Sequence, residues 1–270
     1  MPELPEVETT RQGIAPHCEG RRIRRLLIRN PALRWPVPAD LPARMEGHTI
    51  HAVDRRGKYI LIRLDAGTAI VHLGMSGSMR VVTGPAPPLK HDHVELQLDN
   101  ELIIRFNDPR RFGCWLWSDT PDQHPLLNAL GPEPLAAEFT GALLYRLARG
   151  RQVAVKSFIM DSRVVVGVGN IYANEALFKA GIHPNRKAGR ISADRYHRLA
   201  EAIRETLSAA ILMGGTTLRD FVNSDGKPGY FAQSLLVYGK RGQPCPACQR
   251  PLREVRTGQR STVYCGHCQR

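Results

Sequence analysis

The chain has 270 residues, 42% of them hydrophobic, with a formal net charge of +13 at pH 7 and a sequence pI near 9.9. It is long enough for two domains, or for one domain with an appendage. It has no apolar run of about eighteen residues and starts on an acidic segment, so we expect neither membrane insertion nor secretion. This charge excess is typical of proteins that contact nucleic-acid phosphates, although ribosomal, RNA-binding and membrane-surface proteins share it.

The first predicted element is a helix near the start of the chain. Pro5 suits a first helical turn, and Val7 and Ile14 lie seven residues apart on one helical face. Pro16 is expected to end the helix, because proline has no backbone N–H for the helical ladder.

Pro2 stands just before this helix, and removal of Met1 would give it a free secondary amine. A terminal amine titrates at about 7.7 to 8.0, well below lysine, and the positive end of the helix dipole further disfavours its protonated form. A neutral amine is a nucleophile, and Glu3 lies beside it as a proton carrier. Taken alone, the pattern is better explained by proline being a common second residue.

The first half of the chain is predicted to be a β-sandwich or barrel. Short apolar or alternating stretches are separated by turn residues, without the rhythm of strands alternating with helices, which favours antiparallel pairing. The predicted strands are residues 22–28, 49–53, 58–64, 69–73, 94–98, 101–106 and 114–117. Residues 84–88, rich in proline, are predicted to form an exposed loop.

The second half is predicted to be helical. Pro132 and Pro134 interrupt the chain and indicate a hinge, and the stretches that follow have helical spacing up to about residue 213. The predicted helices are residues 140–149, 155–161, 170–180 and 193–213, the last capped by Ser192. Residues 220–231 are glycine-rich and polar and are predicted to form a mobile loop.

The tail has the spacing of a zinc site. Cys245 and Cys248 form one pair, Cys265 and Cys268 the other, and sixteen residues separate the pairs. Four thiolates fill the tetrahedral coordination of Zn²⁺ and leave no open position, so the metal is expected to be structural. His267 is not expected to be a ligand.

Two features of the second half suit phosphate binding. The predicted zinc hairpin carries four arginines that fit DNA phosphates, namely Arg250, Arg253, Arg256 and Arg260. Zinc ribbons that bind proteins look similar. Gly167 and Gly169 precede a predicted helix, where backbone amides can approach a phosphate. The alternative is an ordinary glycine turn in which Asn170 caps the helix.

Two apolar side chains are predicted at loop tips. Met75 lies in a glycine-flanked turn after an apolar strand, and Phe112 follows Arg110 and Arg111 in a second turn. Both could be core residues. Beside arginines at a loop tip, however, such side chains can wedge into a base stack and support base flipping.

Taken together, these motifs resemble the formamidopyrimidine-DNA glycosylase family, bacterial base-excision enzymes that remove 8-oxoguanine and ring-opened purines and then cut the strand. The resemblance runs from end to end of the chain. It is most specific in MPELPEVETT at residues 1–10, NDPRRFG at 107–113, GVGNIYANEALF at 167–178 and the zinc tail that ends in CQR.

The resemblance implies the catalytic residues. Pro2 is expected to attack C1′ of the flipped nucleotide, Glu3 to protonate the sugar or carry protons, and Lys58 to contact phosphate and the lesion. Glu6 is expected to support the site, and Arg260 to hold the phosphates beside the lesion.

It also implies the residues that contact DNA, which are His72, Met75, Arg110, Phe112, Lys156, Asn170 and Arg260. Met75, Arg110 and Phe112 are expected to fill the gap left by the everted base, and Asn170 to share phosphate contacts with Arg260. Lys156 is expected near the lesion, with residues 216–230 closing over the base.

The implied architecture is an α+β multidomain fold. Residues 1–131 would form an N-terminal helix and an antiparallel β-sandwich with the catalytic residues, 132–234 a helical DNA-binding domain with a helix–two-turn–helix element and a lesion-covering loop, and 235–270 a four-cysteine zinc-finger hairpin. One structural Zn²⁺ is the expected cofactor, and double-stranded DNA with oxidised purines the expected partner. We expect a monomer in the bacterial cytoplasm, at the nucleoid.

Two alternatives fit part of the pattern. The endonuclease VIII type shares Pro2, Glu3 and the zinc finger but acts on oxidised pyrimidines; it typically lacks the LPEV at residues 4–7, and residues 217–229 here resemble a purine-lesion loop. A non-catalytic protein that binds damaged DNA fits the charge, the zinc site and the wedge residues equally well. Only Pro2, Glu3 and Lys58 separate it from an enzyme.

Overall fold

The computed structural model describes residues 2–84, 86–216 and 231–270. The chain divides into two compact units, each built from two chain segments. Unit 1 comprises Met1–Asn128 and Met213–Ala232, and unit 2 comprises Ala129–Leu212 and Gln233–Arg270. The three-part division at residues 131 and 234 stays a prediction.

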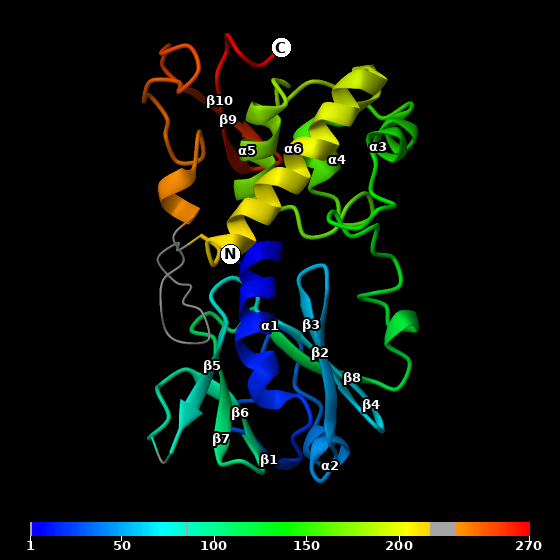
Figure 1. Cartoon of the computed structure of the whole chain (residues 1–270), viewed down its shortest axis with the longest axis vertical. Helices are drawn as coiled ribbons and strands as arrows, with labels where there is room; N and C mark the ends of the chain where they lie inside the picture. The colour runs from blue at the N-terminus through cyan, green and yellow to red at the C-terminus, as the bar shows by residue number, and fades with distance from the viewer. Residues whose placement is uncertain (1, 85, 217–230) are drawn as a thin grey trace. The chain divides into compact units, whose positions relative to one another are not determined.

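Unit 1 contains two antiparallel four-stranded sheets (Figure 1). One has the order β1 (Ile23–Ile28), β6 (Asp92–Leu98), β7 (Leu102–Asn107) and β5 (Ser78–Thr83). The other has the order β2 (Ile50–Arg56), β3 (Tyr59–Leu64), β4 (Gly67–His72) and β8 (Cys114–Ser118). Inward-facing residues of both sheets form one apolar core, which is the arrangement of a sandwich.

Helix α1 (Leu4–Cys18) packs on this sandwich along strands of both sheets, β2 and β5. Val7 and Ile14 are buried on its inner face, as their spacing predicts. The predicted end at Pro16 is wrong, because the helix continues to Cys18. Proline lacks only its own N–H bond, and here that loss falls in the last turn, where the Glu19 N–H still donates to the Ala15 carbonyl at 2.9 Å.

Two elements of unit 1 are absent from the sequence prediction, namely strand β5 and the short helix α2 (Leu41–Met45). A helix of five residues that starts with Leu41-Pro42 is too short to show helical periodicity. A 3-10 turn, η1 (Pro121–Gln123), follows β8.

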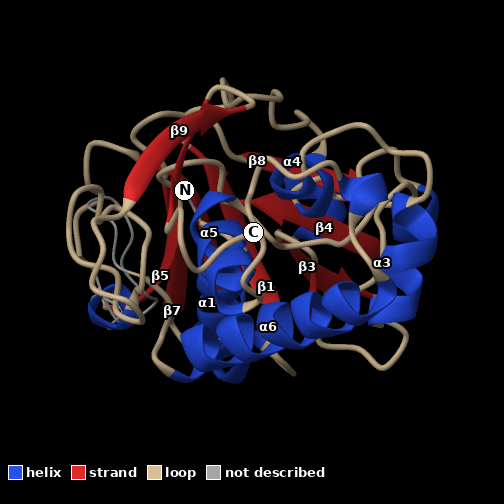
Figure 2. Cartoon of the chain, turned by 90° about the horizontal axis from the view of Figure 1, so that it is seen from above, coloured by secondary structure: helices blue, strands red, loops and turns tan. Residues whose placement is uncertain are grey.

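Unit 2 consists of helices and a zinc-type hairpin. Its helices are α3 (Gly141–Ala148), α4 (Val155–Ile159), α5 (Asn170–Lys179) and α6 (Ala193–Leu212), with 3-10 turns η2 (Ala188–Arg190) and η3 (Phe231–Ser234), the latter shared with unit 1. The long helix α6 packs against α3 and α5 (Figure 2). Strands β9 (Arg253–Thr257) and β10 (Arg260–Tyr264) pair antiparallel, and β10 packs against α5. In the part of the chain that the structure describes, no helix is long and apolar enough to cross a membrane.

Candidate functional site

Pro2 and Glu3 lie at the start of α1, and both are buried. Glu3 is the residue before the helix and has extended backbone angles, φ −105° and ψ −169°. Its N–H donates to Glu6 Oε2 at 2.8 Å, so the first helical turn fixes the backbone directly behind Pro2. A carboxyl group only 1% exposed, next to the predicted amine, is suited to exchange protons with a bound substrate.

The second carboxylate oxygen of Glu6 holds another segment of unit 1. Glu6 Oε1 accepts from the Thr216 N–H at 2.8 Å and from Thr216 Oγ1 at 2.9 Å. Gly215 has φ +80°, and a Cβ there would lie 3.1 Å from the same oxygen. Glu6 therefore ties the start of α1 to residues 215–216. The predicted lesion-covering loop beyond Thr216 lies outside the described residues.

Lys58 is placed by the hairpin between β2 and β3. Gly57 and Lys58 form its two-residue turn, with Gly57 first and φ +59°, the pattern of a II′ hairpin. Arg55 donates to the Gly57 carbonyl at 3.0 Å and to Glu8 Oε2 at 2.9 Å, which ties the hairpin to α1. Burial raises the pKa of Glu8, but hydrogen bonds from Arg11 and Arg55 outweigh it and lower the pKa overall.

His72 ends β4, and its ring lies 4.9 Å from the ring of Tyr59. Burial, together with the charges of Lys58 and Arg34, lowers the pKa of His72 to about 4. Its Nδ1 accepts from the Gly74 N–H at 2.9 Å, so the neutral ring carries its proton on Nε2. At neutral pH, His72 can donate one hydrogen bond to a ligand without adding charge.

The two predicted wedge loops lie against each other. Met75 is half-buried in the turn after β4, whereas Phe112 is 42% exposed, with the Arg110 guanidinium carbon 4.9 Å from its ring centre. A Cβ on Gly74 would come within 2.4 Å of the Phe112 backbone. Only glycine therefore allows this approach of the two loops.

Asp108, which sequence reasoning did not single out, joins these loops. It is fully buried, and its two carboxylate oxygens accept from Ser76 Oγ and from the Gly113 N–H, each at 2.8 Å. The Arg110 N–H also donates to Ser76 Oγ, at 3.2 Å. Asp108 thus positions the Met75 turn and the Arg110–Phe112 turn as one rigid element.

Asp108→Ala is expected to loosen both turns, since it leaves the Ser76 hydroxyl and the Gly113 N–H buried without an acceptor, at about 1–3 kcal/mol each. The melting temperature should fall, and affinity for a duplex containing an abasic site should weaken about tenfold, as measured by fluorescence anisotropy. Asp122→Ala, which alters an exposed aspartate of η1, is the control. Wild-type affinity of Asp108→Ala would contradict the positioning role.

In unit 2, α5 organises the neighbouring segments. Gly167 has φ +82°, and Asn170 begins the helix. Asn170 Oδ1 is buried and has no hydrogen-bond partner within the described residues. Asn174 Oδ1 accepts from the Val263 N–H at 2.8 Å, which joins α5 to β10.

Glu175 is a second residue that sequence reasoning missed. It is 1% exposed, and its carboxylate accepts three consecutive backbone N–H groups at 2.7 to 3.0 Å, those of Leu236, Val237 and Tyr238. A buried carboxylate with three donors fixes the chain that leads into the zinc hairpin. Its only sequence signal is its place within GVGNIYANEALF.

Lys156 is 1% exposed and lies on α4. Its Nζ donates to the Ser261 carbonyl at 2.9 Å and to Thr262 Oγ1 at 2.7 Å. The lysine thus attaches β10 to α4. Its predicted place near the lesion stays a prediction.

The four cysteines of the tail converge. Their sulfurs all lie within 4.8 Å of one another, with Cys245 and Cys268 3.9 Å apart and Cys248 and Cys265 3.5 Å apart. Tetrahedral Zn²⁺ with bonds of about 2.3 Å needs sulfurs about 3.8 Å apart, so the cluster fits the metal. His267 is exposed and outside the cluster.

Arg260 lies at the tip of the zinc hairpin. The turn residues Gly258 and Gln259 have φ +55° and +62°, as in a I′ hairpin, and Arg260 opens β10 with an exposed side chain. The cation is therefore held on a short, rigid β-ribbon.

Three family models match the chain. They are the formamidopyrimidine-DNA glycosylase N-terminal domain over residues 1–115, the formamidopyrimidine-DNA glycosylase H2TH domain over 130–222, and a zinc finger found in FPG and IleRS over 242–270. A formamidopyrimidine-DNA glycosylase of Marinobacter nauticus is 73% identical over 270 residues, which are 100% of both chains.

Solved structures have the same fold. A mutant FPG of Lactococcus lactis, in complex with DNA containing Fapy-dG, is 32% identical with a TM-score of 0.92 over 100% of both chains. The FPG protein of Thermus thermophilus is 40% identical, with a TM-score of 0.89 over 99% of this chain and 98% of that one. The helical stretch predicted to hold a helix–two-turn–helix element falls within the second family model.

Proposed function

The chain belongs to the formamidopyrimidine-DNA glycosylase family and is a base-excision repair DNA glycosylase, and on this premise we propose how its residues act. The proposed substrate is double-stranded DNA with an oxidised purine, either 8-oxoguanine or a formamidopyrimidine. Residues of both units take part, and the protein acts as a monomer. We place it in the bacterial cytoplasm at the nucleoid, where this substrate lies.

Pro2, freed by removal of Met1, acts as the nucleophile. Its nitrogen forms a bond to C1′ while the bond from C1′ to the base breaks; the nitrogen gives up its proton, and the base leaves protonated. Glu3 protonates O4′ as the sugar ring opens, which leaves an iminium between Pro2 and C1′. The buried pair formed by the Glu3 backbone and the Glu6 carboxylate, directly behind Pro2, is the observation that carries this assignment.

The iminium makes the chain a lyase as well as a glycosylase. It withdraws electrons from C2′, so a C2′ proton is lost and the 3′ phosphate is expelled; a second elimination then expels the 5′ phosphate. Lys58 contacts a phosphate and the lesion, and hydrolysis of the remaining iminium frees Pro2.

The other site residues hold the DNA. Asn170 and Arg260 bind the phosphates beside the lesion, since an amide and an exposed guanidinium are both phosphate donors. The element that Asp108 joins supplies Met75, Arg110 and Phe112 to fill the gap left by the everted base. His72, a neutral hydrogen-bond donor, and Lys156 make the remaining contacts with DNA. Lys156 lies beside β10, the strand that carries Arg260.

The four cysteines of the tail would hold a structural Zn²⁺. Four sulfur ligands would join the two ends of the hairpin through the metal and leave it no reactive position. The chain's own contribution is to hold the four sulfurs together on a hairpin that presents Arg260.

The substrate assignment is tested by comparing lesions in one duplex sequence. The chain should cleave 8-oxoguanine opposite cytosine to a gap with phosphate at both ends, and should cleave dihydrothymine at least about tenfold more slowly under single turnover. Faster cleavage of dihydrothymine would favour the endonuclease VIII type. Tight binding without cleavage of either duplex would favour a non-catalytic protein.

A further inference from the structure

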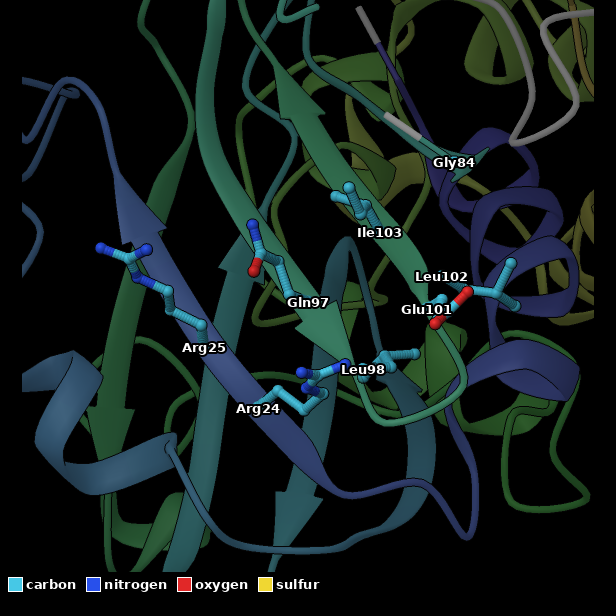
Figure 3. A pocket seen from close by; sticks show the side chains of 8 residues that line it. All are labelled: Arg24, Arg25, Gly84, Gln97, Leu98, Glu101, Leu102 and Ile103. Carbon is cyan, nitrogen blue, oxygen red and sulfur yellow. The ribbon is translucent and has the colours of Figure 1, made fainter. Parts of the chain in front are cut away.

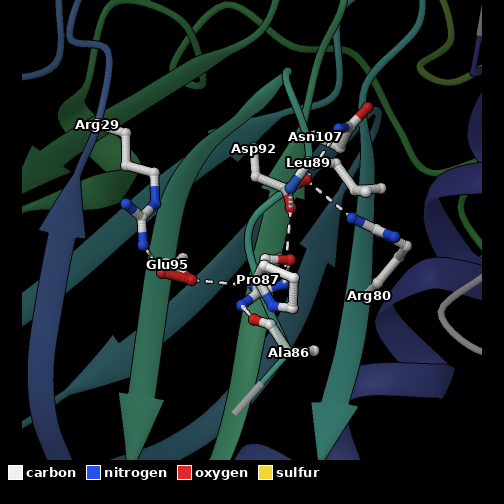
Figure 4. A network of polar contacts seen from close by, with 9 residues as sticks. Arg29, Arg80, Ala86, Pro87, Leu89, Asp92, Glu95 and Asn107 are labelled. Carbon is white, nitrogen blue, oxygen red and sulfur yellow. Dashed lines mark hydrogen bonds and ion pairs between the residues drawn. The ribbon is translucent and has the colours of Figure 1, made fainter.

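The outer face of the sheet β1-β6-β7-β5 is covered over only part of its length. Arg105 on β7 is 4% exposed and donates to the Pro87 carbonyl at 3.0 Å and to the Ala86 carbonyl. The Leu89 N–H donates to Asp92 Oδ2 at 2.8 Å (Figure 4). These bonds hold residues 86–91 over one part of the face.

The arginines that this cover adjoins have acidic partners. Arg105 pairs with Glu95 at 2.9 Å and Arg80 with Asp92 at 2.8 Å. The exposed Arg29 also pairs with Glu95. Where the chain covers this face, it therefore compensates each cation.

Among the described residues, the rest of the face is not covered and forms a groove of about 520 Å³ (Figure 3). The strand register places Arg25, Gln97 and Ile103 side by side across three strands. Glu101, in the turn before β7, and Leu102, the first residue of β7, also line the groove. The solvated face of an antiparallel sheet normally carries polar residues. Ile103 on this face is instead apolar and half-buried, and a partner could pack against it.

Arg24 and Arg25 form the other wall of this groove. A β-bulge between Ile23 and Arg25 makes two consecutive side chains exposed, against the usual alternation. Within the described residues, neither guanidinium has an ion pair or hydrogen bond, in contrast to that of Arg29, the residue after β1. Two adjacent cations without an ion pair can each accept a carboxylate from a ligand.

We propose that this groove binds an extended acidic segment of a partner protein, whose carboxylates pair with Arg24 and Arg25 and whose apolar side chain packs on Ile103. A DNA backbone fits the groove less well, because the apolar side chains of Ile103 and Leu102 offer no hydrogen bond to phosphate or sugar. The partner does not add a strand, since the edge of β1 is occupied: the Leu26 N–H donates to Glu46 at 2.9 Å.

The groove is remote from Pro2. Helix α1 has 15 residues and rises about 22 Å, and Arg21, close to the start of β1, bonds back to Cys18 at the far end of the helix. A bound segment therefore leaves the start of α1 accessible, so the groove can attach the enzyme to another protein while it acts on DNA.

The probe is a fluorescein-labelled acidic peptide, Asp-Asp-Leu-Asp-Phe-Asp, titrated with the full-length protein at physiological salt. Wild type should raise its anisotropy, and R24E/R25E should weaken binding about tenfold or more, because it replaces two charge-assisted contacts with repulsion. R146E/R198E makes the same change of net charge on exposed residues of α3 and α6 and should bind like wild type.

Two further measurements separate the outcomes. Cleavage of 8-oxoguanine DNA by R24E/R25E should equal that of wild type. R24Q/R25Q removes the same two cations by a milder change and serves in its place if the charge reversal impairs folding; it should also lose peptide binding. No binding by wild type, or equal binding by both groove variants and wild type, would overturn the proposal. The proposal would also be overturned if undamaged duplex displaced the peptide and R24E/R25E bound that duplex more weakly than wild type, because the groove would then be a DNA contact.

Discussion

An N-terminal extension that is not removed should reduce strand cleavage at 8-oxoguanine by on the order of a thousandfold or more, because it converts the Pro2 amine into an amide. An amide nitrogen has no lone pair for C1′ and cannot form an iminium. Single-turnover cleavage of a labelled duplex measures the effect, and the intact mass of the protein establishes that the extension is present. Glu3 and Glu6 remain in the sequence, so the loss reports on the amine.

The control for this variant is the same extension placed after Arg270, which should leave cleavage unchanged. Since Pro2 is buried, affinity for an abasic-site duplex is measured in parallel, so that lost binding is distinguished from lost chemistry. Cleavage at the wild-type rate by the N-terminally extended chain would exclude Pro2 as the nucleophile.

Cys248→Ser should release Zn²⁺ and disorder the hairpin of β9 and β10. The apolar cluster there has few members, and two of the buried ones, Cys245 and Cys265, are themselves ligands. So small a core cannot replace a metal whose binding contributes about 10–16 kcal/mol in zinc-finger peptides. Metal content by atomic absorption should fall to zero, and affinity for an abasic-site duplex should fall on the order of a hundredfold as Arg260 loses its support.

Cys18→Ala is the matched control, since Cys18 is a buried cysteine outside the cluster. It should keep its zinc and its affinity for DNA. A Cys248→Ser protein that binds DNA as tightly as wild type would show that the zinc hairpin is dispensable for recognition.

The fold could be predicted largely because its signals are local. Alternating strands between turn residues, helical spacing in the second half and paired cysteines are all read within short windows, and the predicted α+β fold is confirmed. Strand β5 was missed because its few residues lie between a glycine-flanked turn and a proline-rich segment. Pairing with β7 makes it a strand, and sequence spacing does not reveal that partner.

The site was predictable at the level of motifs but not of contacts. Arg110 and Phe112 stand out by composition, whereas Asp108 matters because it meets Ser76, 32 positions away in the chain. Glu175 likewise bonds residues 61 to 63 positions later. A buried carboxylate looks like a surface one in sequence, because its donors are distant backbone groups that only the folded chain brings near.

Borohydride trapping tests whether this glycosylase works through the amine of Pro2. The chain is incubated with duplex containing 8-oxoguanine opposite cytosine, reduced, digested and mapped by mass spectrometry. We expect one covalent adduct, on the peptide that begins with Pro2 and lacks Met1. An adduct on a lysine such as Lys58, or cleavage with no adduct at all, would contradict it.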